Sequence, residues 1–479
     1  LKIDCLKPNS SRKGDSVIRK LDSKLIFAII ATGLMSFSGV VIETATNVTF
    51  PVLMSTFHVS TAMVQWMTTG YLLVAAIVMP LSAFFKNNFP SKHLFITAAS
   101  LFILGLLIDI YAPNFLLLVL GRICQGIGTG IALPLMFNII LEQAPVEKIG
   151  LLMGIGMLIT AIAPALGPTF GGLVVNTLGW RNIFVFILPL VIMALLLGAW
   201  AIRQGTPLKP SPLDKTGLFF IALTFIGLIS ACGNLSKLTK APLSFIIPLV
   251  IGSVGLLLSG RHSLRVAHPL LSLRILNNRK FTQHLIAFFL LQLAVLGISF
   301  ILPNYIQLVN HQTALLAGLI VLPGAALGAL FAPLSGSLFD KFGARQPILA
   351  GIVVELLALL LFVLFARSLS NLLIGFFYLL FMCGLSLVMG NTMTNGLTAI
   401  PAAQKPDGNA LFNTLQQFAG AVGTALVSAI MQLSQNANFP ASYAARTVLG
   451  AQYSFSLLLL LIVLAAVLLI LGTRKRITT

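Results

Sequence analysis

The chain has 479 residues, of which 58% are hydrophobic and only 9% are charged, with 30 Lys and Arg against 11 Asp and Glu. Soluble globular proteins are about 25% charged, so this composition cannot cover a water-facing surface of ordinary size. It excludes a soluble enzyme, a disordered chain and a secreted disulfide scaffold. With a mean hydropathy of +1.01, the sequence predicts an all-α integral membrane protein.

Apolar segments recur along the chain between breaks rich in Pro, Asn, Gly and charged residues. A transmembrane helix needs about 20 mainly apolar residues, and a helix satisfies its own backbone hydrogen bonds in lipid. The pattern predicts fourteen transmembrane helices. In chain order they cover 25–49, 62–85, 93–112, 115–141, 149–174, 181–202, 216–233, 243–260, 281–303, 314–335, 346–366, 371–397, 410–433 and 452–472.

The distribution of Lys and Arg predicts the orientation of these helices, because cytoplasmic loops are enriched in both residues. With the N-terminus in the cytoplasm, the inner segments hold 24 Lys and Arg and the outer loops hold five. We therefore expect a multi-pass membrane protein with both termini in the cytoplasm. The net charge of +19 is then an anchor for the inner leaflet of the lipid bilayer, and no nucleic-acid partner is expected.

Sequence signatures of enzymes, metal sites and ATP-driven pumps are missing from the chain. The four Cys form no CxxC or Cys/His spacing, and no HExxH, GxSxG or GxxxxGK[ST] segment is found. Such segments supply metal ligands, an activated serine or a phosphate-binding loop. We therefore expect no enzymatic activity, no metal and no cofactor.

Four ionisable side chains stand out at membrane depth in the predicted spans, namely Glu43, Asp109, Arg122 and Glu355. A charge at that depth costs at least about 2.5 kcal/mol, so each is a candidate for function. Glu43 lies late in an outward-running helix and Arg122 early in an inward-running one, which places both in the outer half of the bilayer. Their common depth is consistent with contact between them. Asp109 lies near the outer end of its span, where we expect it to reach water.

The fifth span combines small residues with proline in the run Gly167-Pro168-Thr-Phe-Gly171-Gly172. Small residues four apart let helix backbones touch, whereas a proline inside a helix cannot donate a backbone hydrogen bond and bends it. We interpret this span as a bent, closely packed helix that acts in gating.

A second candidate for gating is the loop after the tenth span, Gly336-Ser-Leu-Phe-Asp340-Lys-Phe-Gly343-Ala-Arg345. Glycine permits a tight turn and close helix approach, while Asp and Arg can pair with charges or helix termini across a moving seam.

These segments resemble the motifs of the major facilitator superfamily, and in particular of its fourteen-helix drug:proton antiporter family. The loop at 336–345 is similar to the superfamily's GxLaDrxGrk loop, and 122–130 is similar to its RxxqGxg pattern. The run at 163–172 is similar to the gxxxGPxxGG pattern of drug/proton antiporters. The first span ends in a segment similar to LDxTIVNxALP, with Glu43 in place of Asp. The resemblance covers about residues 25–472.

The resemblance implies the major facilitator fold, with six-helix bundles at 25–202 and 281–472. Two inserted helices and a cytoplasmic linker at 203–280 would lie between them, and basic cytoplasmic tails at 1–24 and 473–479 would flank the whole. It also implies efflux of a small-molecule substrate by alternating access, carried out by a monomer.

The loop after the second span departs from the family pattern. Asn87 and Pro90 stand where the superfamily has Asp and Gly. We therefore expect the inner gate of the first bundle to lack a charge lock.

Glu43 is the expected proton-binding carboxylate. Because an apolar environment disfavours a charged carboxylate, Glu43 can hold a proton from outside and exchange it for a cationic substrate. Asn47 lies one turn further on and extends the same polar face as a substrate contact. Arg122 and Gln125 share one helical face, where Arg122 would pair with an acid and tune its proton affinity and Gln125 would contact substrate. A structural hydrogen bond between helices is the alternative for Glu43.

Further polar and aromatic side chains are predicted near the substrate. Trp66 and Tyr71 can stack against an aromatic or cationic drug or belong to an interfacial belt. Gln292 and Glu355 can contact substrate in the second bundle or bond to a neighbouring helix. His284 flanks a span, and we expect it to be solvated or interfacial.

The resulting hypothesis is a proton-coupled antiporter that exports hydrophobic or cationic drugs or toxic compounds. The alternative is a secondary transporter dedicated to one metabolite, such as an amino acid or a peptide, because a fold does not determine a substrate.

Overall fold

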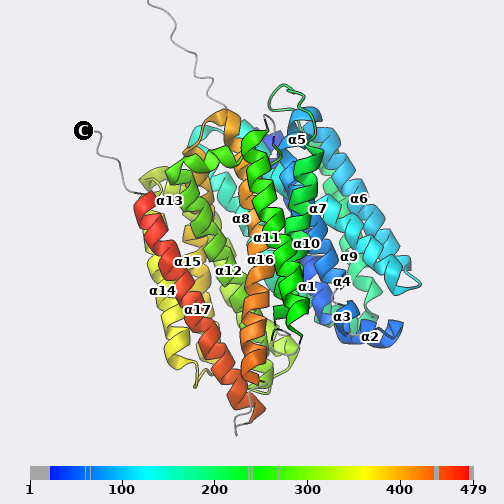
Figure 1. The fold of residues 1–479 in the computed structure, drawn as a ribbon, viewed down its shortest axis with the longest axis vertical. Helices are drawn as coiled ribbons and strands as arrows, with labels where there is room; N and C mark the ends of the chain where they lie inside the picture. Colours follow the sequence, from blue (N-terminus) through cyan, green and yellow to red (C-terminus); the bar gives the residue numbers. More distant parts are fainter. Residues whose placement is uncertain are drawn as a thin grey trace, which may run out of the picture.

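The computed structural model describes residues 22–473 except 60, 65, 236–237, 239–240, 267–268 and 436–441. Within these residues every regular element is a helix (Figure 1). The basic tails predicted at 1–24 and 473–479 lie outside the described residues, apart from 22–24 and 473.

The first part of the chain contains α1 (Ser23–Val48), α2 (Phe50–Phe57), α3 (Thr61–Val64), α4 (Trp66–Val78), η1 (Met79–Leu81), α5 (Ser82–Asn88), α6 (Ser91–Tyr111), α7 (Phe115–Gln143), η2 (Val146–Lys148), α8 (Ile149–Leu178) and α9 (Arg181–Ala201). The middle contains α10 (Lys215–Asn234), α11 (Pro242–Arg265) and η4 (Leu273–Asn277). The last part contains α12 (Arg279–Leu308), α13 (Ala314–Phe342), α14 (Arg345–Phe365), α15 (Asn371–Thr398), η5 (Ala402–Gln404), α16 (Lys405–Gln435) and α17 (Tyr443–Gly472).

Thirteen helical segments of the described chain are long and apolar enough to cross a membrane when α4, η1 and α5 are taken together as Trp66–Asn88. The helix α8 contains a further apolar stretch, Ile162–Val175. With α8 the number equals the fourteen spans predicted from the sequence. The second predicted span is divided, because Pro80 interrupts it and a short 3₁₀ segment, η1, joins α4 to α5. A proline lacks the backbone donor that a continuous α-helix needs.

Several of these helices are capped at their N-termini by polar side chains. The side-chain oxygens of Asn114, Asp214, Thr313, Ser370 and Ser442 each accept a hydrogen bond from a backbone N–H in the first turn of the helix that follows. Each cap satisfies a backbone donor that has no partner inside the helix.

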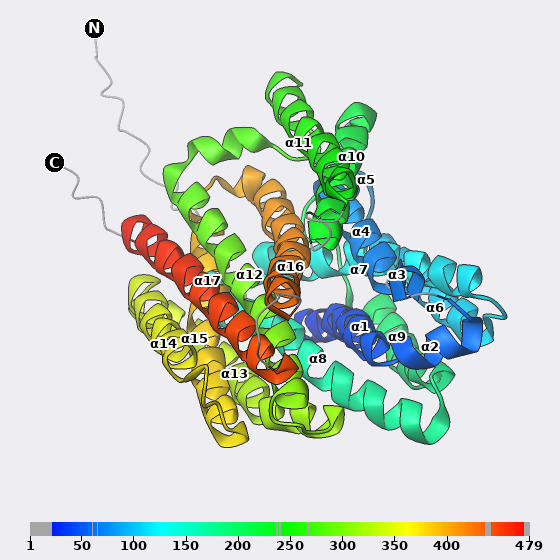
Figure 2. The same cartoon turned by 60° about the horizontal axis from the view of Figure 1, so that its bottom comes forward.

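Six long helices on each side form two bundles, which Figure 2 shows side by side. The N-terminal bundle contains α1, α4 and α6 to α9, and the C-terminal bundle contains α12 to α17. The end at which α7 ends and α8 and α16 begin is called the inner end, because the Lys and Arg distribution predicts that it faces the cytoplasm. It lies at the top of Figure 1.

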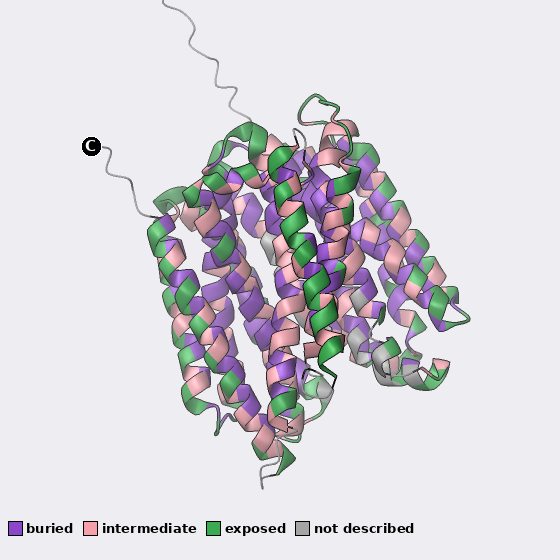
Figure 3. Cartoon of the chain, in the orientation of Figure 1, coloured by how far each residue is buried: buried purple, intermediate pink, exposed green. Residues whose placement is uncertain are grey.

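Of the two inserted helices, α10 stands beside α4 and α16, and α11 packs on α10, so neither lies inside a bundle (Figure 2). They pack closely on each other because Gly227 of α10 meets Gly252 of α11 without side chains between them. Phe225 of α10 contacts Phe418 of α16, with ring centroids 5.8 Å apart. Most of α11 is exposed or half-buried (Figure 3), which suits a helix surrounded by lipid.

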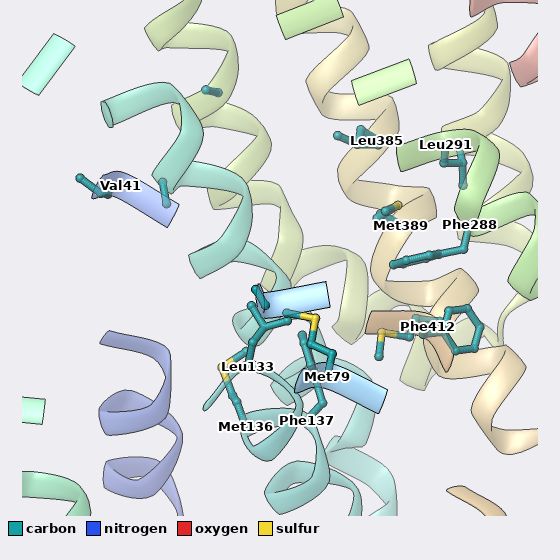
Figure 4. Packing of buried hydrophobic residues seen from close by; sticks show 14 of the residues in the cluster. Val41, Met79, Leu133, Met136, Phe137, Phe288, Leu291, Leu385, Met389 and Phe412 are labelled. Carbon is teal, nitrogen blue, oxygen red and sulfur yellow. The ribbon is translucent and has the colours of Figure 1, made fainter. Parts of the chain in front are cut away.

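Buried apolar side chains of both bundles form one continuous layer toward the inner end (Figure 4). The N-terminal bundle contributes Met79, Leu133, Met136 and Phe137, and the C-terminal bundle contributes Phe288, Leu385, Met389 and Phe412. The Phe288 and Phe412 rings meet edge to face, with centroids 5.0 Å apart. Apolar side chains of both bundles thus belong to one core in the half of the molecule that is predicted to face the cytoplasm.

Candidate functional site

A buried arginine lies at the centre of the N-terminal bundle. The side chain of Arg122, on α7, is 0% exposed. Its Nη1 donates a hydrogen bond to Oε1 of Gln125 at 2.6 Å, and its Nε donates to the backbone oxygen of Met67 on α4 at 3.3 Å. Its guanidinium carbon lies 4.4 Å from the ring centroid of Tyr71, within the range of a cation–π interaction. These contacts from two helices fix the position of the cation.

Asp109 of α6 is joined to this arginine through Gln125. The Gln125 Nε2 donates to Asp109 Oδ2 at 2.7 Å, and the Asp109 carboxylate and the Arg122 guanidinium interact electrostatically. The expectation that Asp109 reaches water was wrong, since it is 0% exposed. Gly105 and Gly121 bring α6 and α7 so close together that α7 covers the carboxylate.

Glu43 of α1 faces the same cluster. Gly39, one turn before it, lies against the hydroxyls of Thr129 and Tyr71, and residues four apart share a helix face. The charge of Glu43 interacts with that of Arg122. The structure therefore brings together the two ionisable groups that the sequence places at one depth. Glu43 is half-buried, whereas the Tyr71 hydroxyl is fully buried and donates to Thr129 Oγ1 at 3.0 Å.

The glycines of α8 pack directly on α1 next to Glu43. A side chain at Gly167 would meet Thr44, and one at Gly171 would meet Ala45. Pro168 lies inside the helix between these two contacts. The outer half of α8 is thus in backbone contact with the helix that carries the candidate proton site.

At the inner end, α8 joins the C-terminal bundle. The Asp340 carboxylate at the end of α13 accepts hydrogen bonds from the backbone N–H groups of Gly150 and Leu151, both at 3.2 Å. Gly336 lies against the backbone of the same two residues. Gly343 ends α13 with a φ of +77°, a backbone conformation that is strained for any residue with a side chain. Asp340 therefore caps a helix terminus across the seam between the bundles.

A second contact across the inner end involves charges that the sequence did not reveal as partners. Lys86 of α5 forms an ion pair with Glu142 of α7, and it interacts electrostatically with Asp407 in the first turn of α16. The expectation that this gate lacks a charge lock was wrong. Lys86 finds its acids on α7 and α16, and neither of these acids belongs to the loop itself.

Two asparagines connect the bundles beside this ion pair. The Asn409 Nδ2 on α16 donates to Asn138 Oδ1 at 2.8 Å and to the backbone oxygen of Pro134 at 3.0 Å. Asn409 is 0% exposed and Asn138 is 4% exposed. Since buried polar groups are costly to leave unpaired, these bonds favour the closed inner end.

Among the described residues, the contacts of Arg122 are with the N-terminal bundle, and the predicted polar residues of the C-terminal bundle lie elsewhere. Glu355 is 0% exposed and lies where Gly351 and Gly384 bring α14 and α15 together. Gln292 is half-buried on α12. The expectation for His284 was wrong, because it is 0% exposed, with Nδ1 2.7 Å from the Lys280 backbone oxygen and Nε2 2.7 Å from Asn395 Nδ2.

The other predicted residues lie at varied positions. Trp66 is 50% exposed at the start of α4, Arg345 is exposed at the start of α14 and Gly172 is half-buried. The side chain of Asn47 lies outside the described residues. In the described part of the chain, no group of three or more His, Cys, Asp or Glu could hold a metal ion.

Comparison with known proteins agrees with this architecture. The sequence profile of the Major Facilitator Superfamily matches residues 28–424. The lincomycin resistance protein LmrB of Listeria monocytogenes is 36% identical over 410 residues, which cover 85% of this chain and 87% of that protein. LmrB of Bacillus subtilis is 35% identical over 416 residues, covering 86% and 87% of the two chains.

Among solved structures, the proton:xylose symporter XylE superposes with a TM-score of 0.66 at 15% sequence identity. The match covers 93% of this chain and 95% of the symporter. At that identity the similarity concerns the fold alone, and it extends over both bundles.

Proposed function

Because the chain belongs to the major facilitator superfamily, a family of membrane transporters, we propose that it exports drugs or other toxic hydrophobic or cationic compounds in exchange for protons. The lincomycin resistance proteins that it resembles over most of its length support the choice of substrate class. The proposed location is the bacterial cytoplasmic membrane with both termini in the cytoplasm.

One observation carries the proposed coupling to protons, namely the position of Glu43 beside Arg122. Glu43 is half-buried and within electrostatic reach of that cation, so its carboxylate can be approached while the guanidinium is held in place. A carboxylate in an apolar bundle needs a proton or another cation to balance its charge. Competition of a proton and a cationic substrate for Glu43 would produce antiport.

The packing of α8 supports a route by which Glu43 influences the inner end. The outer half of α8 rests on α1 at Gly167 and Gly171, and its inner end is capped by Asp340 of α13. A change of charge at Glu43 that shifts α1 would therefore act on a helix that also holds the seam. Alternating access needs this kind of link between the substrate site and a remote gate.

The proposal is tested with purified protein in liposomes that carry an imposed pH gradient. Wild-type protein should accumulate ethidium, a fluorescent hydrophobic cation, against its gradient, and a protonophore should abolish the accumulation. Glu43→Gln should lose uphill accumulation by at least about tenfold, because an amide cannot exchange a proton for a cation. Parallel assays should include lincomycin, given the relatives.

Glu147→Gln is the matched control, because Glu147 is an exposed carboxylate in η2 at the inner end. It should accumulate ethidium like the wild type. Accumulation that survives the protonophore would contradict proton coupling, and unchanged coupling in Glu43→Gln would remove Glu43 from the mechanism.

A further inference from the structure

Two carboxylates in the N-terminal bundle share a single guanidinium. Arg122 interacts electrostatically with both Glu43 and Asp109, and Gln125 links it to Asp109 by hydrogen bonds of 2.6 Å and 2.7 Å. Asp109 and Arg122 are both 0% exposed. Among the described residues, Asp109 Oδ1 has no hydrogen-bond partner.

The charges of this cluster do not balance unless it holds a proton. With both carboxylates ionised, one guanidinium leaves a net charge of about −1 in an apolar bundle, which is costly. One proton on either carboxyl restores neutrality. The unpaired Asp109 Oδ1 is an atom that can carry it.

We propose that Glu43 and Asp109 together hold one exchangeable proton and that Asp109 neutralises Arg122 whenever a cationic substrate occupies Glu43. This inference rests on the proposed function, and it adds a second carboxylate to the coupling site. In the resting state the proton lies on one of the two carboxyls. When a cation binds the Glu43 carboxylate, Asp109 pairs with Arg122 and the proton leaves to water, so the cluster is neutral before and after the exchange.

The helices around Asp109 contribute a defined set of ionisable neighbours. α7 contributes Arg122 and Cys124, both within electrostatic reach of Asp109. α9 contributes Arg181, whose Nη2 donates to the backbone oxygen of Ala112 at 2.8 Å at the end of α6. Arg181 thus contacts the backbone at the end of α6 and the ring of Trp180, 4.2 Å from its guanidinium carbon. Arg122 is the cation that Asp109 reaches through Gln125.

The variant Asp109→Asn removes one of the two acids and should abolish proton release. In this variant Arg122 and an ionised Glu43 balance each other, so no proton is left to release and a bound cation would add an uncompensated charge. Ethidium-induced proton release, measured with a pH dye in weakly buffered detergent solution, should fall at least tenfold from about one proton per bound ethidium. Ethidium affinity should fall in the same variant.

Two further variants test whether Asp109 acts through its charge or only through its structural contacts. Asp109→Glu keeps the carboxylate and should retain proton release. The double variant Asp109→Asn with Arg122→Gln removes one acid and one cation, leaves Glu43 with its proton, and should regain release that the single variant lacks. Thermal unfolding shows which variants are folded, and Glu147→Gln serves as the unaffected control.

Each outcome decides a different question. Wild-type protein that binds ethidium without releasing protons would overturn the proposed function and this inference together. Release from the wild type that is fully retained in Asp109→Asn would overturn the inference alone. If Asp109→Asn does not fold, the double variant decides, and a folded double variant that releases no proton would also overturn it.

Discussion

In the N-terminal bundle, Asp109, Gln125 and Arg122 form one hydrogen-bonded chain, with Glu43 facing the same cation. In the C-terminal bundle, Glu355 is equally buried, but neither of its carboxylate oxygens has a hydrogen-bond partner in the part of the chain that the structure describes. One bundle thus surrounds a cation with acids and amides, and the other holds a carboxyl alone between two helices.

This difference indicates what each carboxyl can do. An uncompensated charge between packed helices is costly, so a solitary Glu355 is expected to stay protonated and neutral. The acids of the N-terminal bundle can gain or lose a proton because Arg122 compensates one negative charge. In the mechanism that we propose, charge exchange belongs to the N-terminal bundle, and the C-terminal bundle contributes Asp340 and Asn409 to the inner seam.

Removing the shared cation should have the largest effect. Arg122→Gln deprives Asp109 and Glu43 of their counter-charge, removes the bond to the Met67 backbone oxygen and leaves a gap beneath Tyr71. Breaking a buried ion pair by deleting one partner costs about 3–5 kcal/mol. We expect a loss of that size in the free energy of unfolding, measured by denaturant or thermal unfolding in detergent.

Arg345→Gln is the control for this variant, because it removes an exposed arginine at the start of α14. Its effect should stay within about 0.5 kcal/mol. Equal stability of Arg122→Gln and Arg345→Gln would mean that the buried network contributes nothing to folding.

The two buried acids should respond with opposite signs to an apolar substitution. Asp109→Leu leaves the Gln125 amide without its acceptor, and an unsatisfied buried donor costs about 1–3 kcal/mol. Glu355→Leu removes oxygens for which the described residues offer no partner, so it should raise the unfolding temperature. Thermal unfolding of both variants in one detergent tests the contrast.

The two leucine variants should also differ in transport activity. Glu355→Leu should retain proton-driven ethidium accumulation, whereas Asp109→Leu should lose it. If Glu355→Leu destabilises the protein, the carboxyl has a partner that depends on the membrane or on another conformation, and the contrast between the bundles disappears.

The sequence predicted the helices well because hydropathy marks the hydrocarbon layer directly. The helix ends were less predictable, since a helix continues until its hydrogen bonds are terminated. The span predicted at 314–335 belongs to a helix that ends only at Phe342, where Gly343 adopts a positive φ. Hydropathy falls before that point, but the backbone stays helical.

Part of the site could also be predicted from the sequence. Depth along a helix follows from counting residues, and it placed Glu43 and Arg122 together. Burial depends on the neighbouring helices that cover a side chain, and the position of a residue along its own helix does not reveal them. Asp109 is covered because glycines let α6 and α7 touch, and His284 is enclosed beside Gly472 and Asn395. Small residues facing these positions were the signal that sequence reasoning missed.

The bundles also differ in what they contribute at the inner end, and here the expected effect is smaller. The C-terminal bundle provides Asp340, which caps α8 of the N-terminal bundle through Gly150 and Leu151. Asp340→Asn keeps one acceptor oxygen but places an NH2 donor against the other backbone N–H, so it should lose one of the two bonds, and one hydrogen bond is worth about 0.5–1.5 kcal/mol. Because that bond crosses the seam, Asp340→Asn should weaken the closed inner end relative to the open one by about twofold to tenfold.

Spin labels at positions 147 and 404 measure this change, on a background without the native cysteines. Glu147 and Gln404 are exposed at the inner ends of opposite bundles, so their separation should shift to longer values in Asp340→Asn. Asp22→Asn is the matched control, because Asp22 caps α1 and pairs with Arg203 on the N-terminal side.

If the distance shifts as much in the control as in Asp340→Asn, the effect comes from the loss of a helix cap in general and not from the seam. An unshifted distance in Asp340→Asn would leave the seam to Asn138, Asn409 and the apolar layer, and Asp340 would then stabilise α8 without acting in gating.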